Sequence, residues 1–200
     1  MESISIGLLG LGTVGSGVVK IIENHQDKLI HQIGCPVHIK KILVKDMEKD
    51  RKDIIDKCLI TNIPDDILED PEIDVIIEVM GGIEETRQHI LKAVRNKKHI
   101  VTANKDLMAL YGPELLAEAT KNGCDLFYEA SVAGGIPILR GLVDGLASDR
   151  VMKMIGIVNG TTNFILTKMS KFGTPYEEVL KEAQELGYAE SDPTADVEGL

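Results

Sequence analysis

Two kinds of apolar pattern alternate along the first 135 residues of the chain. Short runs in which nearly every residue is apolar occupy residues 4–9 and 73–82, and the first of them ends in glycines. Runs of this length without alternation are typical of parallel strands that are buried on both faces. Further strands are expected at about 37–44, from His99 into the loop that follows Thr102, and from Cys124.

Between these runs, apolar positions recur with helical spacing. One helix is expected from Val14 to Ile33, closed by Gly34 and Pro36. Residues 83–98 form a second amphipathic segment, in which acids come first and bases last, as the helix dipole favours. A third helix is expected to end at Gly123.

The order of these elements predicts the fold class. Strands that alternate with helices imply an α/β fold, with a doubly wound parallel sheet and right-handed connections. The charged segment 46–57 is expected to be a surface loop with some helix. The pattern changes after Gly135, so we expect one domain at 1–132 and the start of a second at 133–200.

Within the second region we expect a helix in 136–149, a strand beginning near Arg150, and helices in 164–173 and 174–187. The strand is expected to end in the polar turn 159–163, a candidate helix cap.

Composition narrows the function classes. The net charge of −10 argues against a protein that neutralises a nucleic-acid backbone. No apolar run approaches the ~18 residues of a membrane helix, and no basic signal-peptide region precedes the first strand. The three cysteines are scattered, as expected for buried thiols in a reducing compartment. We therefore expect a cytoplasmic protein with neither membrane nor nucleic acid as partner.

A GxGxxG pattern lies at residues 10–15, between the first strand and the first helix. Its glycines permit a tight turn, close approach of a pyrophosphate, and tight packing of helix against strand, while helix N–H groups face the anion. The sequence predicts a dinucleotide site here. The alternative is a glycine-rich packing turn with no ligand.

The end of the second strand offers charges of both signs. Lys45, with Arg51, could hold the 2′-phosphate of NADP, whereas Asp46 could accept the ribose hydroxyls of NAD. The sequence favours NADP and leaves NAD open.

Two more strand ends carry candidate chemistry. Lys105 follows a strand and would place a positive charge at the carboxyl edge of the sheet. Glu129 precedes small residues and two glycines, a turn that can direct carbonyl oxygens at a hard cation or serve only as a hinge.

Five motifs together resemble those of homoserine dehydrogenases. They appear in the family's order along nearly the whole chain: GLLGLGTVG, TANK, EASVAGGIP, NGTTNFILTKM and the closing AxxxGYxExDPxxDVxG. The resemblance implies a Rossmann sheet followed by part of an α+β catalytic domain. It also implies NADP- or NAD-dependent interconversion of L-homoserine and L-aspartate 4-semialdehyde, in the biosynthesis of threonine, methionine and isoleucine.

The resemblance assigns roles to individual residues. Lys105 is the position that contacts both cofactor and substrate, and Glu190 is the position that accepts the substrate ammonium, a charge-assisted contact. The remaining cofactor positions are Gly10, Gly12, Thr13, Val14, Gly15, Gly81, Gly82 and Gly187. The positions of a sodium-type cation site are Glu129, Val132, Gly134 and Ile136.

The family's closing motif continues beyond Leu200 with a substrate-binding Asp and a proton-transferring Lys. The resemblance therefore implies the N-terminal part of a longer, homodimeric enzyme. We expect residues 1–200 alone to bind the nicotinamide cofactor weakly at best and to have little or no dehydrogenase activity. Two other interpretations are a non-catalytic dinucleotide-binding module and a semialdehyde oxidoreductase that acylates a cysteine. The position of Cys124 at the start of a strand disfavours the second.

Overall fold

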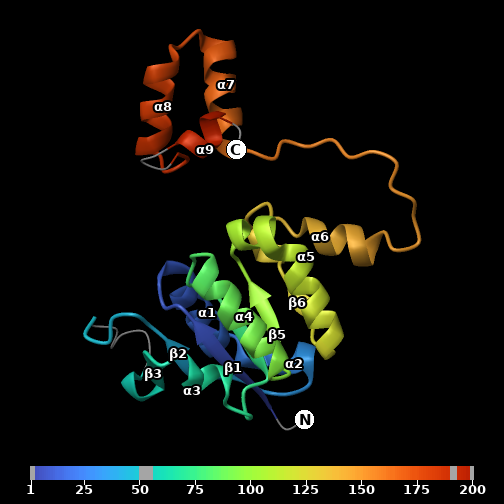
Figure 1. The fold of residues 1–200 in the computed structure, drawn as a ribbon. Coiled ribbons are helices and arrows are strands. Elements are labelled where there is room, and N and C mark those ends of the chain that lie inside the picture. Colours follow the sequence, from blue (N-terminus) through green and yellow to red (C-terminus); the bar gives the residue numbers. More distant parts are fainter. Residues whose placement is uncertain (1–2, 50–55, 190–192, 199–200) are drawn as a thin grey trace. The chain divides into compact units, whose positions relative to one another are not determined.

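The computed structural model describes residues 3–49, 56–189 and 193–198. Contacts divide the chain into two compact units, Met1–Gly145 and Leu146–Leu200 (Figure 1). Each unit is described by itself. The division into domains at 1–132 and 133–200 stays a prediction.

The first unit is built on a six-stranded sheet in the order β3-β2-β1-β4-β5-β6. All five pairings are parallel, which confirms the doubly wound sheet. The strands are β1 (Ile4–Leu9), β2 (Val37–Leu43), β3 (Ile60–Thr61), β4 (Val75–Glu78), β5 (His99–Thr102) and β6 (Leu126–Phe127).

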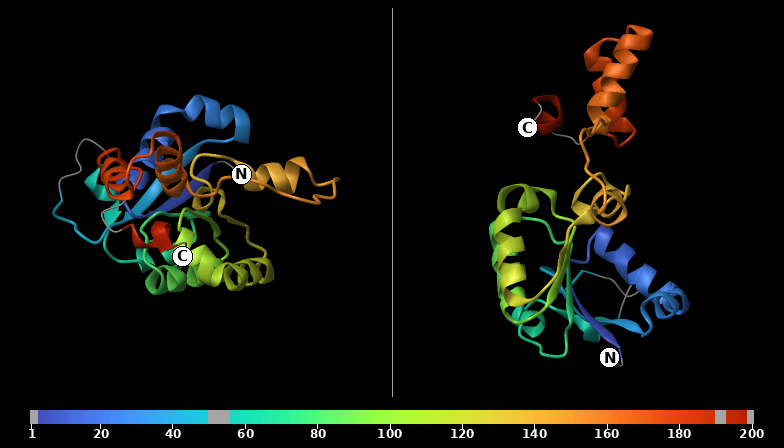
Figure 2. Two further views of the ribbon diagram at one scale, coloured as in Figure 1. Left: turned by 90° about the horizontal axis from the view of Figure 1, so that it is seen from above. Right: turned by 90° about the vertical axis from the view of Figure 1, so that its right-hand side faces the viewer.

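Helices cover both faces of this sheet. Figure 2 shows α1 (Thr13–Asn24) and α2 (Gln26–Ile33) on one face, with α4 (Glu84–Arg95) and α5 (Lys105–Asn122) on the other. The short α3 (Asp65–Leu68) packs with the second pair, because its Ile67 belongs to the same core cluster as Ile90 of α4. Within β1, Leu8 packs beneath α1 while Leu9 faces the core under α4 and α5.

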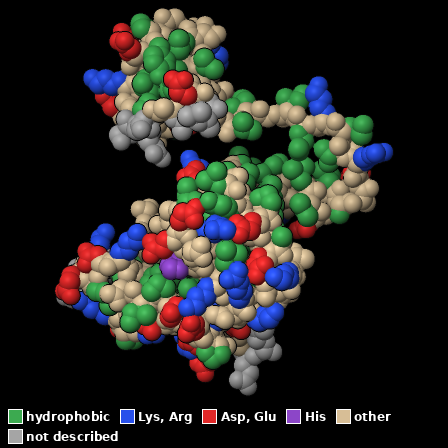
Figure 3. All heavy atoms as spheres, viewed as in Figure 1, with side chains coloured by type: hydrophobic (Ala, Val, Ile, Leu, Met, Phe, Trp, Pro, Cys, Tyr) green, Lys and Arg blue, Asp and Glu red, His purple; other side chains and the backbone are tan. Residues whose placement is uncertain are grey.

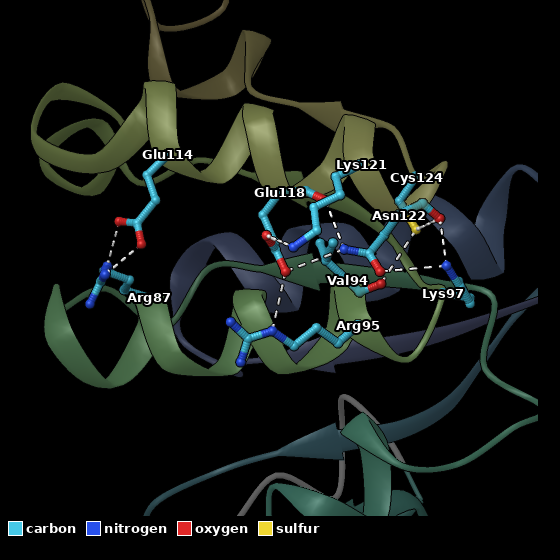
Figure 4. A network of polar contacts seen from close by, with 9 residues as sticks. All are labelled: Arg87, Val94, Arg95, Lys97, Glu114, Glu118, Lys121, Asn122 and Cys124. Atoms are coloured by element: carbon cyan, nitrogen blue, oxygen red, sulfur yellow. Dashed lines mark hydrogen bonds and ion pairs between the residues drawn. The ribbon is translucent and has the colours of Figure 1, made fainter.

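Charged side chains join α4 to α5 above that core. The guanidinium of Arg87 pairs with both carboxylate oxygens of Glu114, at 2.8 and 2.5 Å, and Arg95 bonds to Glu118 at 3.2 Å (Figure 4). The buried thiol of Cys124 lies at the same interface, 3.6 Å from the carbonyl oxygen of Val94. The two helices thus form one layer behind β4 and β5.

The single helix expected from Val14 to Ile33 is wrong, because the chain breaks at His25. At the break, the side-chain amide of Gln26 bonds both to the end of α1 and to β2. Its Nε2 donates to the carbonyl oxygens of Ile22, at 3.0 Å, and of Val37 in β2, at 2.5 Å. This contact lets α2 begin in a new direction while remaining attached to the sheet.

Two short elements, β3 and α3, were not expected from the sequence. The helix expected in 83–98 is confirmed as α4, and the one ending at Gly123 is confirmed as α5. Of the helix expected in 136–149, the structure has α6 (Ile138–Arg140) and a π-helical turn at Gly141–Gly145. Hydrophobic side chains gather on the surface of α6 (Figure 3). Residues 50–55 of the charged segment lie outside the described residues.

The second unit contains α7 (Gly160–Phe172), α8 (Tyr176–Glu185) and α9 (Thr194–Glu198). Its core is formed where α7 packs on α8, around Ile165, Val179 and Ala183. The strand expected near 150–158 is wrong, because residues 150–159 form neither helix nor strand. Strand propensity reflects packing against neighbours, and Ile155 and Val158 are 85% and 100% exposed.

Lys98 precedes β5 and is 2% exposed. Its Nζ donates to the carbonyl oxygens of Asp70 and Ile73. Burial lowers its pKa from 10.5, although Asp70 and Asp74 act in the opposite direction. The folded state therefore binds fewer protons than the unfolded state between the lowered pKa and 10.5, so this lysine adds stability as the pH rises through that window.

We predict that the free energy of unfolding of the wild type, relative to Lys98→Met, increases as the pH rises towards 10.5. Methionine has a similar shape and does not titrate, so the difference isolates this one ammonium. Urea unfolding followed by circular dichroism at several pH values measures it. A difference that is constant with pH would contradict the assignment.

Candidate functional site: the carboxyl edge of the sheet

The turn between β1 and α1 passes unusually close to the end of β4. Gly10 has a φ of 104°, and a Cβ there would lie 2.8 Å from both Met80 Cα and the carbonyl oxygen of Val79. On its other side, Gly10 N–H donates to Leu43 O of β2 at 3.0 Å. The turn therefore lies between β2 and β4, at the point where the strand order reverses and where ligands bind in such sheets.

The other two glycines of the motif differ in what surrounds them. A Cβ on Gly15 would lie 2.2 Å from Gly10 O, so this glycine is required by the packing of α1 on the turn. A Cβ on Gly12 would meet nothing within 4 Å. No contact among the described residues requires a glycine at position 12, and the open space there would let a ligand approach the backbone closely.

The N-terminus of α1 suits an anion. Thr13 and Val14 begin the helix and both are exposed. The first turn of α1, all of it described, contains no acidic residue, and its N-cap makes no side-chain hydrogen bond. The N–H groups and the positive end of the helix dipole are thus left for a negatively charged partner.

A cleft of about 710 Å³ adjoins this turn. Gly10, Gly12 and Lys45 all line this cleft. Lys45 Nζ lies 3.7 Å from Glu85 Oε2, and both side chains are largely exposed. Asp46 is turned onto its own chain, because its Oδ1 accepts the N–H groups of Glu48 and Lys49 at 2.9 and 3.2 Å. Arg51 lies outside the described residues.

The end of β4 continues into a turn at 79–82, in which Gly81 and Gly82 have φ values of 72° and 75°. Asn104, in the loop after β5, donates from Nδ2 to Gly82 O at 2.7 Å and caps α5 by accepting Leu107 N–H. Lys105 is the first residue of α5 and is exposed. Lys105 and the two glycines therefore lie on adjacent loops, as the motif positions suggest.

Glu78, the last residue of β4, is fully buried behind these loops. Burial raises its pKa above 4.5, and hydrogen bonds from Thr102, Met80 and Gly81 oppose this shift. Sequence analysis did not single it out. The only signal in the sequence is one acidic residue in an otherwise apolar strand.

The proposed cation positions follow β6. Both carboxylate oxygens of Glu129 accept backbone N–H groups, from Leu139 at 2.9 Å and Arg140 at 2.8 Å. Ala133 and Gly134 have left-handed backbone, with φ values of 57° and 60°, and Ile136 O accepts the N–H of Ile138.

The described residues contain no group of three or more His, Cys, Asp or Glu that could hold a metal. The predicted positions would supply a different donor set, one carboxylate and three carbonyl oxygens, and hard oxygens of this kind suit a cation such as sodium. Beside its two N–H bonds, the carboxylate of Glu129 retains lone pairs. Val132 also borders a hollow of about 360 Å³ that it shares with Lys105.

In the second unit, the 159–163 turn caps α7, because Asn159 Oδ1 accepts Thr162 N–H at 2.9 Å. Thr161 Oγ1 donates to Tyr188 O at 2.6 Å, which fixes the segment next to Gly187. Gly187 has a φ of 76°. Glu190, the proposed substrate residue, lies outside the described residues.

Two family models match consecutive segments of the chain. Residues 10–129 match the family model for the NAD-binding domain of homoserine dehydrogenase, and residues 137–200 match the model for homoserine dehydrogenase itself. The homoserine dehydrogenase of Bacillus subtilis is 68% identical over 200 residues, which is all of this chain and 46% of that protein. The chain thus spans about half the length of the curated relatives it matches.

Solved structures agree. A homoserine dehydrogenase from Thiobacillus denitrificans is 43% identical with a TM-score of 0.89, over 97% of this chain and 45% of that chain. A hyperthermophilic archaeal homoserine dehydrogenase, solved in complex with NADPH, is 26% identical with a TM-score of 0.81, over 98% and 65% of the two chains.

The second glycine of the motif provides a test of ligand approach. Gly12→Ala should weaken NADPH binding at least about tenfold, because the new methyl group would occupy the space that the pyrophosphate needs. Isothermal titration calorimetry measures the Kd for NADPH of the variant and of the wild type. Stability should fall by no more than about 1 kcal/mol, the difference between glycine and alanine at an N-cap.

Gly17→Ala is the matched control. Gly17 lies one turn further along α1, and a Cβ there also meets nothing within 4 Å. This variant should keep wild-type affinity and gain roughly 0.5–1 kcal/mol of helix stability. Equal affinities for Gly12→Ala and the wild type would mean that the turn is a packing feature only.

Proposed function

The chain belongs to the homoserine dehydrogenase family, and from this premise we propose that its protein transfers a hydride between a nicotinamide cofactor and a four-carbon amino acid. The reaction is the reversible reduction of L-aspartate 4-semialdehyde to L-homoserine. The observation that carries the proposal is the meeting of three loops at one edge of the sheet. The turn at Gly10, the turn at 79–82 and the loop ending at Lys105 combine an anion site with a positive charge.

For the cofactor, the charges at the end of β2 favour NADP. Lys45 and Lys49 both border the cleft beside the glycine turn, and cations suit a 2′-phosphate. Asp46, the residue that would accept ribose hydroxyls in an NAD site, bonds to its own backbone. The archaeal relative solved with NADPH adds support by analogy.

The bound cofactor supplies the hydride chemistry, and the protein supplies alignment and charge. Lys105 places an ammonium where negative charge develops on the substrate oxygen as the aldehyde is reduced, and fixed positive charge of this kind lowers the barrier. Gly81 and Gly82 keep side chains away from the adjoining turn. The reduction also consumes one proton, which the substrate oxygen takes up to become the alcohol.

For the substrate, we propose that Glu190 accepts its ammonium group and that Gly187 lies where cofactor and substrate meet. Within the second unit, the hydrogen bond from Thr161 to Tyr188 O holds the backbone beside Gly187. The cation site at Glu129, Val132, Gly134 and Ile136 is proposed to bind sodium and to order the 129–136 loop beside Lys105. A homodimer in the cytoplasm completes the proposal.

A catalytic cysteine is disfavoured. Burial raises the pKa of Cys124 above 9.0, and the thiolate is the reactive form of cysteine. Its buried Sγ lies 3.6 Å from the carbonyl oxygen of Val94 in α4 (Figure 4), and Cys124 is not among the residues that line the cleft beside the glycine turn.

Lys105→Met in the gene product that contains this chain should lower kcat for homoserine oxidation by roughly a hundredfold, the scale of losing one charged group at the reacting oxygen. Stopped-flow or steady-state absorbance of NADPH measures the rate. Lys28→Met, at an exposed position on α2, should leave kcat unchanged. A Lys105→Met enzyme with wild-type kcat would remove this residue from the mechanism.

Lys45→Ala should raise KM for NADPH about tenfold while changing KM for NADH less than about twofold, because only NADPH carries the 2′-phosphate. Parallel kinetics with the two cofactors measure the ratio. An equal rise in both values would show that Lys45 acts on something the two cofactors share.

A further inference from the structure

Glu78 occupies a position where an acid is costly. It ends β4 in the centre of the sheet, paired with Leu9 of β1 on one side and Thr102 of β5 on the other. The side chain is 0% exposed. A buried carboxylate without hydrogen bonds is strongly disfavoured, so the contacts of this one indicate what it does.

Both of its oxygens accept hydrogen bonds, and the donors belong to the turn after β4 and to the end of β5. Oε1 accepts the N–H groups of Met80 at 2.9 Å and Gly81 at 3.2 Å, in the turn after β4. Oε2 accepts the hydroxyl of Thr102 at 2.6 Å, at the end of β5. All three donors are uncharged groups, two backbone N–H groups and one hydroxyl.

The bonds continue from each loop toward the site. Thr102 Oγ1 accepts the N–H of Asn104 at 3.1 Å, and Asn104 Nδ2 donates back across the gap to Gly82 O at 2.7 Å. Glu78, Thr102, Asn104 and the 80–82 turn therefore close a ring of hydrogen bonds. Lys105 follows Asn104 directly, and Gly10 packs on Met80 at the far side of the turn.

A second buried side chain supports the same turn. Thr86 of α4 is 0% exposed and donates from Oγ1 to Gly81 O at 2.7 Å. The N–H of Gly81 is thus held by Glu78 and its carbonyl by Thr86. This leaves the left-handed glycine pair little freedom to move.

We propose that Glu78 is a positioning residue of the dehydrogenase, whose buried carboxylate fixes the 80–82 turn relative to the loop that presents Lys105. The inference rests on the proposed function. Because its side chain is fully buried, Glu78 acts through Thr102 and Asn104 rather than on a ligand directly. A carboxylate is required because the ring supplies three donors, and a glutamine at this position would offer one acceptor oxygen and add two donors of its own.

The kinetic test uses the full enzyme. Glu78→Gln and Thr102→Val should each lower kcat about tenfold to a hundredfold, as small misplacements of reacting groups do, while the Kd for NADPH, set mainly at the glycine turn, changes less than about threefold. Thr102→Ser keeps the hydroxyl and should recover most of the rate. Glu114→Gln, which removes only the surface pair with Arg87, should match the wild type.

A spectroscopic test does not require activity. In NMR spectra of the 200-residue chain, the amide signals of Met80 and Gly81 should titrate together, with a midpoint above 4.5. Glu78→Gln should abolish this titration, and Thr102→Val should shift the amide signal of Asn104. The Thr102 pair keeps the test decisive if Glu78→Gln fails to fold.

The outcomes separate the two claims. A wild-type enzyme that oxidises no homoserine would overturn the proposed function, and the NMR comparison would still decide whether Glu78 holds the two loops. A wild-type enzyme that is active, with Thr102→Val as fast as Thr102→Ser or with Met80 and Gly81 amides that ignore pH, would overturn the positioning role.

Discussion

The contact on which the rest of the site depends is the close approach of the Gly10 backbone to the end of β4. With 2.8 Å between an imagined Cβ and the backbone of Val79 and Met80, no other residue fits without moving one of the loops. Two turns that are far apart in the sequence are thereby held against each other at the edge where the strands end. Gly15 extends the same constraint to α1, so the N-terminus of that helix points at the place where the turns meet.

Polar side chains hold the 80–82 turn in place beside Gly10. A turn with two left-handed glycines has many conformations open to it in the unfolded chain. Glu78 and Thr86 restrict the 80–82 turn from below, and Asn104 restricts it from the side of β5. Lys105 lies beside this turn as the first residue of α5, an unfavourable place for a cation, and the proposed catalytic role would account for that cost.

Sequence reasoning predicted the sheet and the glycine turn well, because both are written in local patterns. Apolar runs mark the buried strands, and the spacing of Gly10, Gly12 and Gly15 has a direct steric meaning. It missed β3, which has two residues and no pattern of its own, and it joined α1 to α2 because the break at His25 depends on a long-range bond from Gln26 to Val37. It also expected a strand at 150–158, where the apolar side chains find no strand to pack against among the described residues. The hydrogen bonds of Glu78 could not be predicted from the sequence, because a single acidic residue in a strand does not indicate which groups bond to it.

The central claim is that a dinucleotide binds along this edge, with its pyrophosphate on the β1–α1 turn. Mapping amide chemical-shift changes on addition of NADPH tests it most directly. We expect the largest changes at residues 10–15, at 79–82 and at 103–105, with little change at the opposite edge of the sheet near Pro36, Asp74 and Lys98. Changes concentrated at that opposite edge, or spread evenly over the surface, would contradict the account.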